Sequence, residues 1–203
     1  MTGGATLGSV RRLALTGAAL AVVVLPVGSA DAGVWKKLHR PLHIPHIPSG
    51  TACPTTAKAG PLPSAFSGTA AFGHGPVYPG FFAGPSGPEA VVYFAYPPPA
   101  TSELAGSRWS GQKVPWMRSP GYHGPVLIRG RQLDGSHHLR FGLAMVPPTE
   151  LRITRWGSSK GAAGWGFLAG TTRLRAPGCY GYQIDGRTFS RVIVFRAVLL
   201  NPR

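Results

Sequence analysis

Three histidines stand close together in the chain at a spacing that resembles a metal site. His39, His43 and His46 are separated by three and two residues, and neutral imidazoles are good ligands for zinc and copper. Prolines stiffen this segment, however, and no carboxylate lies near to orient the rings. A solvated linker explains the pattern better, so we predict no metal site and no cofactor.

The other histidines and the carboxylates offer no complete catalytic set. His137 and His138 follow Asp134-Gly135, but Asp134 is more simply explained as a turn former than as a catalytic partner. The chain has no nucleophile elbow for His74 or His123 to serve. The free carboxylates, Glu89, Glu103 and Glu150, give no facing pair of the kind a glycosidase needs. We therefore predict no catalytic residue and no enzymatic activity.

Aromatic residues are more suggestive, because many stand in or beside segments rich in glycine and proline. Exposed rings are the usual stacking platforms for sugars, and a neighbouring arginine adds charge contacts. Trp156 follows Arg155, and Trp165 lies between two glycines that would leave its ring faces open. We predict ligand binding by Trp156 and Trp165 first, and by Tyr122 next. The alternative is that such rings are half-buried caps on the ends of the domain.

The charge balance indicates an anionic partner. The chain has 21 basic and 6 acidic residues and a net charge of +15, which favours polyanions such as cell-wall polymers, lipid headgroups or acidic polysaccharide. A second explanation competes with this one: arginine predominates over lysine, as in proteins from high-G+C genomes. That bias accounts for arginine over lysine, but it does not account for so few acids.

The N-terminal 32 residues are predicted to be a cleaved signal peptide. Arg11 and Arg12 precede an apolar run from Leu13 to Val27, and Ala30-Asp31-Ala32 is a cleavage signature. The alternative is an uncleaved anchor, but the apolar run is shorter than the roughly 20 residues that cross a bilayer. We therefore predict a secreted protein whose mature chain does not span a membrane. Association of the secreted protein with the cell wall is one form of this hypothesis.

Cys53 and Cys179 are the two cysteines of the chain. In an exported protein an even number of cysteines indicates disulfides, and two cysteines allow one pairing. Closing a loop of about 125 residues contributes roughly 4–5 kcal/mol in the chain-entropy model. Residues 33–72 contain prolines that are typical of a linker or tail. The disulfide would attach this segment to a strand near the C-terminal end of the chain.

The sequence pattern of residues 73–203 predicts an all-β domain. Short apolar runs alternate with glycine and proline, and no window has a helical apolar period. Asp185-Gly186 stands between two runs of β-branched and aromatic residues, which is a strong hairpin signal. About seven short strands at spacings near ten residues predict an immunoglobulin-like antiparallel β-sandwich.

The string Ala176-Pro177-Gly178-Cys179-Tyr180 opens one of these strands. Together with residues 124–130 and 189–197, it resembles a group of secreted immunoglobulin-like domain proteins of high-G+C bacteria. The resemblance covers about the last two-thirds of the chain. Because that group has no established activity, the resemblance implies a fold and a secreted location but no reaction.

These observations favour a secreted, non-catalytic binding domain for cell-envelope glycans or other polyanions, and we do not expect nucleic acid as the partner. A structural or accessory domain that binds a protein partner is the alternative. A small secreted hydrolase is the third hypothesis.

Overall fold

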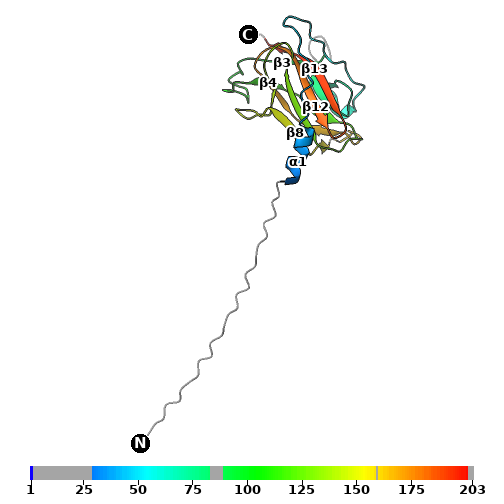
Figure 1. Cartoon of the computed structure of the whole chain (residues 1–203), viewed down its shortest axis with the longest axis vertical. Coiled ribbons are helices and arrows are strands. Elements are labelled where there is room, and N and C mark those ends of the chain that lie inside the picture. Colours follow the sequence, from blue (N-terminus) through cyan, green and yellow to red (C-terminus); the bar gives the residue numbers. More distant parts are fainter. Residues whose placement is uncertain (2–28, 83–88, 159, 201–203) are drawn as a thin grey trace.

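The computed structural model describes Met1 and residues 29–82, 89–158 and 160–200 (Figure 1). The predicted signal peptide, residues 1–32, therefore lies almost entirely outside the described residues. Within them, 13 strands form three hydrogen-bonded sheets, and helix accounts for 6% of the chain. The prediction of an all-β protein is confirmed. No helix in the described ranges is both long and apolar enough to cross a membrane.

One of the two five-stranded sheets, which we call the back sheet, has the order β3-β13-β12-β6-β8. They span Val91–Phe94 (β3), Ser190–Leu199 (β13), Gly178–Gly186 (β12), Val126–Gln132 (β6) and Glu150–Ile153 (β8). β3 runs parallel to β13, whereas the other neighbours are antiparallel. β6 pairs with β12 although five strands separate them in the chain, so the centre of this sheet is formed by long-range pairing.

The predicted hairpin at the end of the chain is β12–β13, but its turn lies two residues later than predicted. Asp185 pairs with Ser190, and the Gly186 N–H donates to the Phe189 carbonyl at 2.9 Å. Arg187 and Thr188 are therefore the turn residues. Asp185 is a strand residue with a buried side chain.

The other two sheets continue one another and form the opposite layer, which we call the front layer. One has the order β1-β2-β5-β10-β9 and the other β4-β11-β7. Their strands span Thr69–Ala71 (β1), Val77–Phe82 (β2), Ser110–Lys113 (β4), Trp116–Arg118 (β5), Arg140–Phe141 (β7), Gly157–Ser158 (β9), Gly166–Leu168 (β10) and Thr171–Leu174 (β11). Residues 110–118 pair with residues 166–174. The ladder breaks at Pro115, which has no N–H to donate.

Aromatic rings fill the space between the layers. The Tyr182 ring lies 4.6 Å from that of Phe195 and 5.1 Å from that of Trp116, measured between centroids. The Tyr182 hydroxyl forms a 2.7 Å hydrogen bond with Thr172 Oγ1. Burial raises the pKa of Tyr182 above its ordinary value. The phenol is therefore held neutral and satisfied inside the core.

Helix α1 (Ser29–Leu38) lies at one end of the sandwich, near β8 (Figure 1). Residues 39–58, which follow it, lie along the outer face of the back sheet, and we call them the strap. Ile44 of the strap is buried with Leu133 and Val194. Cys53 forms the predicted disulfide with Cys179 of β12. The predicted linker region 33–72 thus includes the last six residues of α1, the strap, the short 3-10 helix Ser64–Phe66 and β1, while α1 begins within the predicted signal peptide.

Candidate functional site

Tyr122, one of the residues predicted to bind a ligand, lies in the core. It is 8% exposed, and its ring packs edge-to-face against Phe189 with 5.1 Å between centroids. Its hydroxyl donates to the Pro125 carbonyl at 2.7 Å and accepts from the Arg187 N–H at 3.1 Å. A ligand has no free face of this ring on which to stack, so Tyr122 supports the loops around the β12–β13 turn.

Trp156 and Trp165 are both half-buried, and they pack into different apolar clusters. Trp156 packs against the main core. Trp165 packs on the outer face of the front layer, 5.7 Å from the Tyr78 ring and 6.3 Å from the Phe66 ring. The two indoles therefore do not form one platform. Arg155 is exposed beside Trp156, and a ligand-binding role for these three residues stays a prediction.

The histidine cluster is divided by the fold. His39 Nδ1 lies 3.3 Å from Arg129 Nη1, and its Nε2 lies 3.4 Å from Glu150 Oε2. His43 and His46 are exposed on the strap. Throughout the described ranges, no three His, Cys, Asp or Glu side chains are grouped so that they could hold a metal ion.

Asp185 is the centre of a buried polar network beneath the strap. Its carboxylate accepts from Ser190 Oγ at 2.7 Å, from Arg129 Nη2 at 2.9 Å and from Gln183 Nε2 at 3.0 Å. Arg40 of the strap adds a 3.4 Å contact. A fully buried carboxylate needs such partners because desolvation penalises the charge. The sequence did not reveal this role, because Asp-Gly is also a turn signal.

Several arginines are used to hold backbone carbonyls. Arg173 is fully buried, and burial lowers its pKa below the ordinary value. Its guanidinium donates to the carbonyls of Trp109, Gly142 and Ala144 and to Ser107 Oγ. Arg118 is also buried and donates to loop carbonyls, including those of Ser119 and Tyr122. Part of the high arginine content is therefore structural.

Four of the six acidic residues of the chain form contacts inside the domain. Asp185 is in the buried network, Glu89 lies 3.6 Å from Arg196, and Glu150 pairs with Arg152. Asp134 accepts the Cys179 N–H at 3.0 Å. Glu103, unlike these four, takes part in no ion pair among the described side chains. Most of the surface positive charge therefore has no carboxylate to neutralise it.

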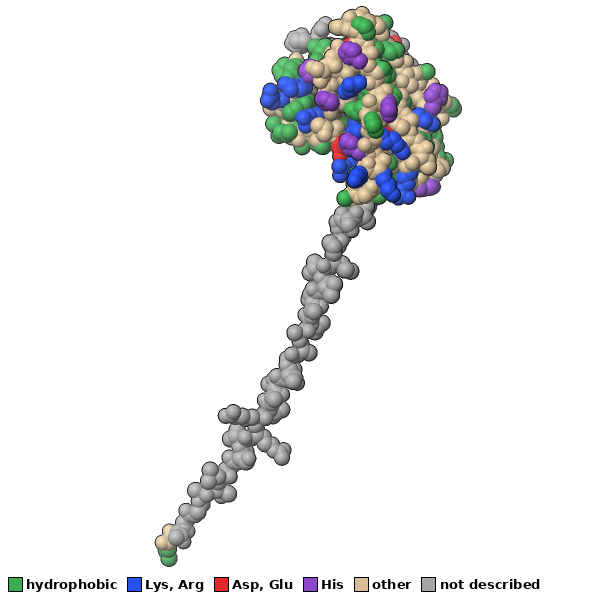
Figure 2. All heavy atoms as spheres, in the orientation of Figure 1, with side chains coloured by type: hydrophobic (Ala, Val, Ile, Leu, Met, Phe, Trp, Pro, Cys, Tyr) green, Lys and Arg blue, Asp and Glu red, His purple; other side chains and the backbone are tan. Residues whose placement is uncertain are grey.

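One group of these cations gathers around α1, and we call it the basic end. A hollow of about 420 Å³ is lined there by Val34, Lys37, Leu38, Arg40 and Arg187. Lys36 is exposed next to Lys37, and the Arg152 guanidinium lies 5.2 Å from the centroid of the Trp35 ring. Lys and Arg side chains gather at the end of the domain that carries α1 (Figure 2). Within the described chain, Lys36, Lys37 and Arg187 form no salt bridge.

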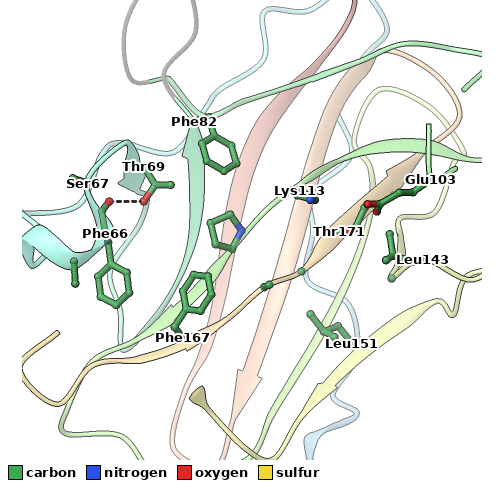
Figure 3. A pocket seen from close by; sticks show the side chains of 15 residues that line it. Phe66, Ser67, Thr69, Phe82, Glu103, Lys113, Leu143, Leu151, Phe167 and Thr171 are labelled. Carbon is green, nitrogen blue, oxygen red and sulfur yellow. Dashed lines mark hydrogen bonds between the residues drawn. The ribbon is translucent and has the colours of Figure 1, made fainter. Parts of the chain in front are cut away.

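A second hollow, of about 570 Å³, lies on the outer face of the front layer, and we call it the groove. Phe66, Phe82 and Phe167 line one part of it, and Lys113 and Glu103 lie at another (Figure 3). A smaller hollow of about 200 Å³ shares Glu103, Lys113, Leu143 and Thr171 with it. The lining residues come from separate strands and loops. A pocket of this size and apolar character is the usual form of a binding site.

No protein family matches the chain, and no curated protein or solved structure matches it either.

Proposed function

We propose that this protein is a non-catalytic binding domain for anionic polymers of the cell envelope, such as acidic glycans, and that the basic end is its binding surface. The observation that carries the proposal is the uncompensated charge of that end. Asp185 and Glu150 neutralise only neighbouring cations of this end, namely Arg40 and Arg152. Lys36, Lys37 and Arg187 are exposed and form no salt bridge in the described chain. Clustered charge of one sign attracts a polyanion and speeds its association.

The neighbouring contacts support this role. Arg40 Nη1 donates to the carbonyls of Gly186 and Phe189 at 3.0 and 2.8 Å. These bonds hold the turn that carries Arg187 against the segment that follows α1. The cations are thereby arranged before any ligand arrives, which lowers the entropic cost of binding. The predicted cleavage before Gly33 would leave Lys36 and Lys37 in the mature chain.

The test is binding of the purified protein to polygalacturonate, an anionic polysaccharide, with uncharged dextran as the neutral comparison. Replacing Lys36, Lys37 and Arg187 together by glutamine is expected to weaken binding at least tenfold at low salt. This follows because each cation near an anionic surface contributes about 1 kcal/mol. Binding of the unaltered protein is expected to fall as salt is added.

A matched control removes the same charge from other parts of the surface. Lys58, Arg108 and Lys160 are exposed and lie outside the basic hollow, so replacing them by glutamine is expected to change the affinity by less than about threefold. If both triple variants lose affinity equally, the attraction is due to net charge alone and the basic end is not a site. Binding to dextran that resists salt would overturn the proposal.

We also propose that the sandwich is of the immunoglobulin type, as in the secreted bacterial proteins that the chain resembles. The support is the adjacency of β6, β12 and β13, which matches the C, F and G strands of that fold. The Tyr180 hydroxyl donates to the Ala176 carbonyl at 2.9 Å. A tyrosine at the start of strand F that bonds back to the preceding loop is a feature of such domains. A secreted location is part of this proposal, and the disulfide is compatible with it.

The alternative function, binding of a protein partner, is favoured by the groove, because its apolar lining suits a protein surface better than it suits a charged polymer.

A further inference from the structure

We propose that the groove is a self-association surface, in which two copies of this chain pack about a two-fold axis. Each copy places the apolar tip of its loop 142–148 in the groove of the other. Lys113 of each copy pairs with Glu103 of the other. This proposal is independent of the polymer-binding function.

Four large apolar residues are exposed in the groove or in the loop beside it. Phe82 is 41% exposed, Leu143 54%, Met145 56% and Val146 71%, and both Phe82 and Leu143 line the groove. Single exposed apolar residues need no explanation. Several exposed apolar residues at the rim of an apolar hollow, and in the loop that continues from it, are typical of a protein interaction site.

Loop 142–148 is held in this exposed position by buried groups. The Arg173 guanidinium donates to the carbonyls of Gly142 and Ala144, at 2.9 and 3.3 Å. Ser107 Oγ donates to the Met145 carbonyl at 3.0 Å, and Arg140 donates to the Pro147 carbonyl at 2.9 Å. A loop whose backbone is already held in this way loses little backbone entropy on binding. The loop is therefore prearranged to present Leu143, Met145 and Val146.

The two charged residues of the groove favour a second copy of this chain as its partner. Lys113 and Glu103 both line it, and neither takes part in a salt bridge among the described residues. A ligand of one charge would meet one attractive and one repulsive side chain. A second copy related by a two-fold axis brings each side chain to its opposite, because a two-fold interface is self-complementary. The same surface also supplies both an apolar projection and an apolar hollow, as such an interface requires.

The first experiment measures molecular mass by sedimentation equilibrium, up to about 100 µM, where complexes of micromolar Kd are formed. The unaltered protein is expected to be a dimer, whereas Lys113→Glu alone and Glu103→Lys alone are expected to be monomers. An equimolar mixture of the two variants is expected to dimerise again, since both contacts then join opposite charges. A monomeric unaltered protein overturns the proposal. A mixture that stays monomeric also overturns it, because pairing within one chain would not be rescued by mixing.

A second pair of variants tests the apolar contact. Met145→Ser with Val146→Ser is expected to weaken dimerisation at least tenfold, because both side chains would be buried in the interface. The control is Leu199→Ser with Leu200→Ser, which changes two exposed apolar residues at the end of β13. The control is expected to dimerise like the unaltered protein. If both pairs, or neither, change the dimer, the loop is not the contact. All substituted residues are exposed, so melting curves should confirm that each variant folds.

Discussion

The outer face of the back sheet is covered at its centre by another segment of the chain, whereas the outer face of the front layer is covered only in part. On the back sheet, the strap covers β12 and β13. Its His43 N–H donates to Gln183 Oε1 at 2.7 Å, and Gln183 Nε2 donates to the Pro41 carbonyl at 2.9 Å. The disulfide fixes the strap covalently to β12. On the front layer, residues 59–66 and 162–165 cover the cluster around Met117, while the groove beside it stays open.

This difference shows where the domain has exposed apolar surface that is available for contact with a partner. Side chains alternate between the two faces of a strand, so Trp116 lies in the core and Met117 on the outer face. An outer face that carries apolar residues needs a cover. The chain provides a complete one for the centre of the back sheet and an incomplete one for the front layer. The uncovered part contains the exposed Phe82 and Leu143, and this is the part for which we propose self-association.

Loss of the disulfide, which lies on the covered face, is expected to have the largest effect on stability. The bond closes a loop of 126 residues, which in the chain-entropy model stabilises the fold by about 4–5 kcal/mol. Replacing Cys53 and Cys179 together by alanine should lower the free energy of unfolding by roughly that amount, measured by denaturant titration. The strands, followed by far-ultraviolet circular dichroism, should persist.

Thiol counting is the check on the starting protein. Two reactive thiols in the denatured, unreduced protein would contradict the bond. A double variant as stable as the unaltered protein would show instead that the noncovalent contacts of the strap are sufficient to hold it.

The buried carboxylate beneath the strap is expected to have the next largest effect. Asp185→Asn keeps the shape of the side chain but leaves Arg129 buried without its counter-charge, and breaking such a pair costs about 3–5 kcal/mol. The matched control is Glu89→Gln, whose partner Arg196 is exposed, and surface pairs contribute about 0–1 kcal/mol. Thermal unfolding of both variants measures the two losses of stability. Equal, small losses would mean that the network of Asp185 does not stabilise the covered face.

The fold was largely predictable because its signals are local. Alternating apolar runs separated by glycine and proline mark strands, and the hairpin and the disulfide were both predicted correctly. The turn of that hairpin was misplaced because Asp185-Gly186 satisfies a turn preference, while the actual turn, Arg187-Thr188, has no special residue. Burial of Asp185 depends on Arg40 and Arg129, which are 145 and 56 residues away in the chain. No local pattern reports such a contact.

The candidate sites were less predictable for the same reason. Strong positive charge was evident from composition, but its concentration at the basic end arises only when α1 and the β12–β13 turn meet. The groove has no sequence motif, because Phe66, Lys113 and Phe167 come from three distant segments. The flanking glycines of Trp165 suggested open ring faces. Instead, Gly166 makes room on the other face of the strand, where an added Cβ would lie 2.7 Å from the Trp156 Cβ.

Trp165→Ala is expected to have the smallest effect and to test the cover of the front layer. The ring is half-buried between Tyr78 and Phe66, so its loss should lower the free energy of unfolding by about 1–2 kcal/mol. That is less than the roughly 3–5 kcal/mol typical of a fully buried tryptophan. Leu143→Ala, at the exposed edge of the groove, is the control and should leave monomer stability nearly unchanged. If Trp165→Ala also leaves stability unchanged, the Trp165 ring is not part of the cover. If the same variant then fails to bind polygalacturonate, the predicted role of Trp165 as a ligand platform is restored. Because the basic end lies elsewhere, we expect that binding to be retained.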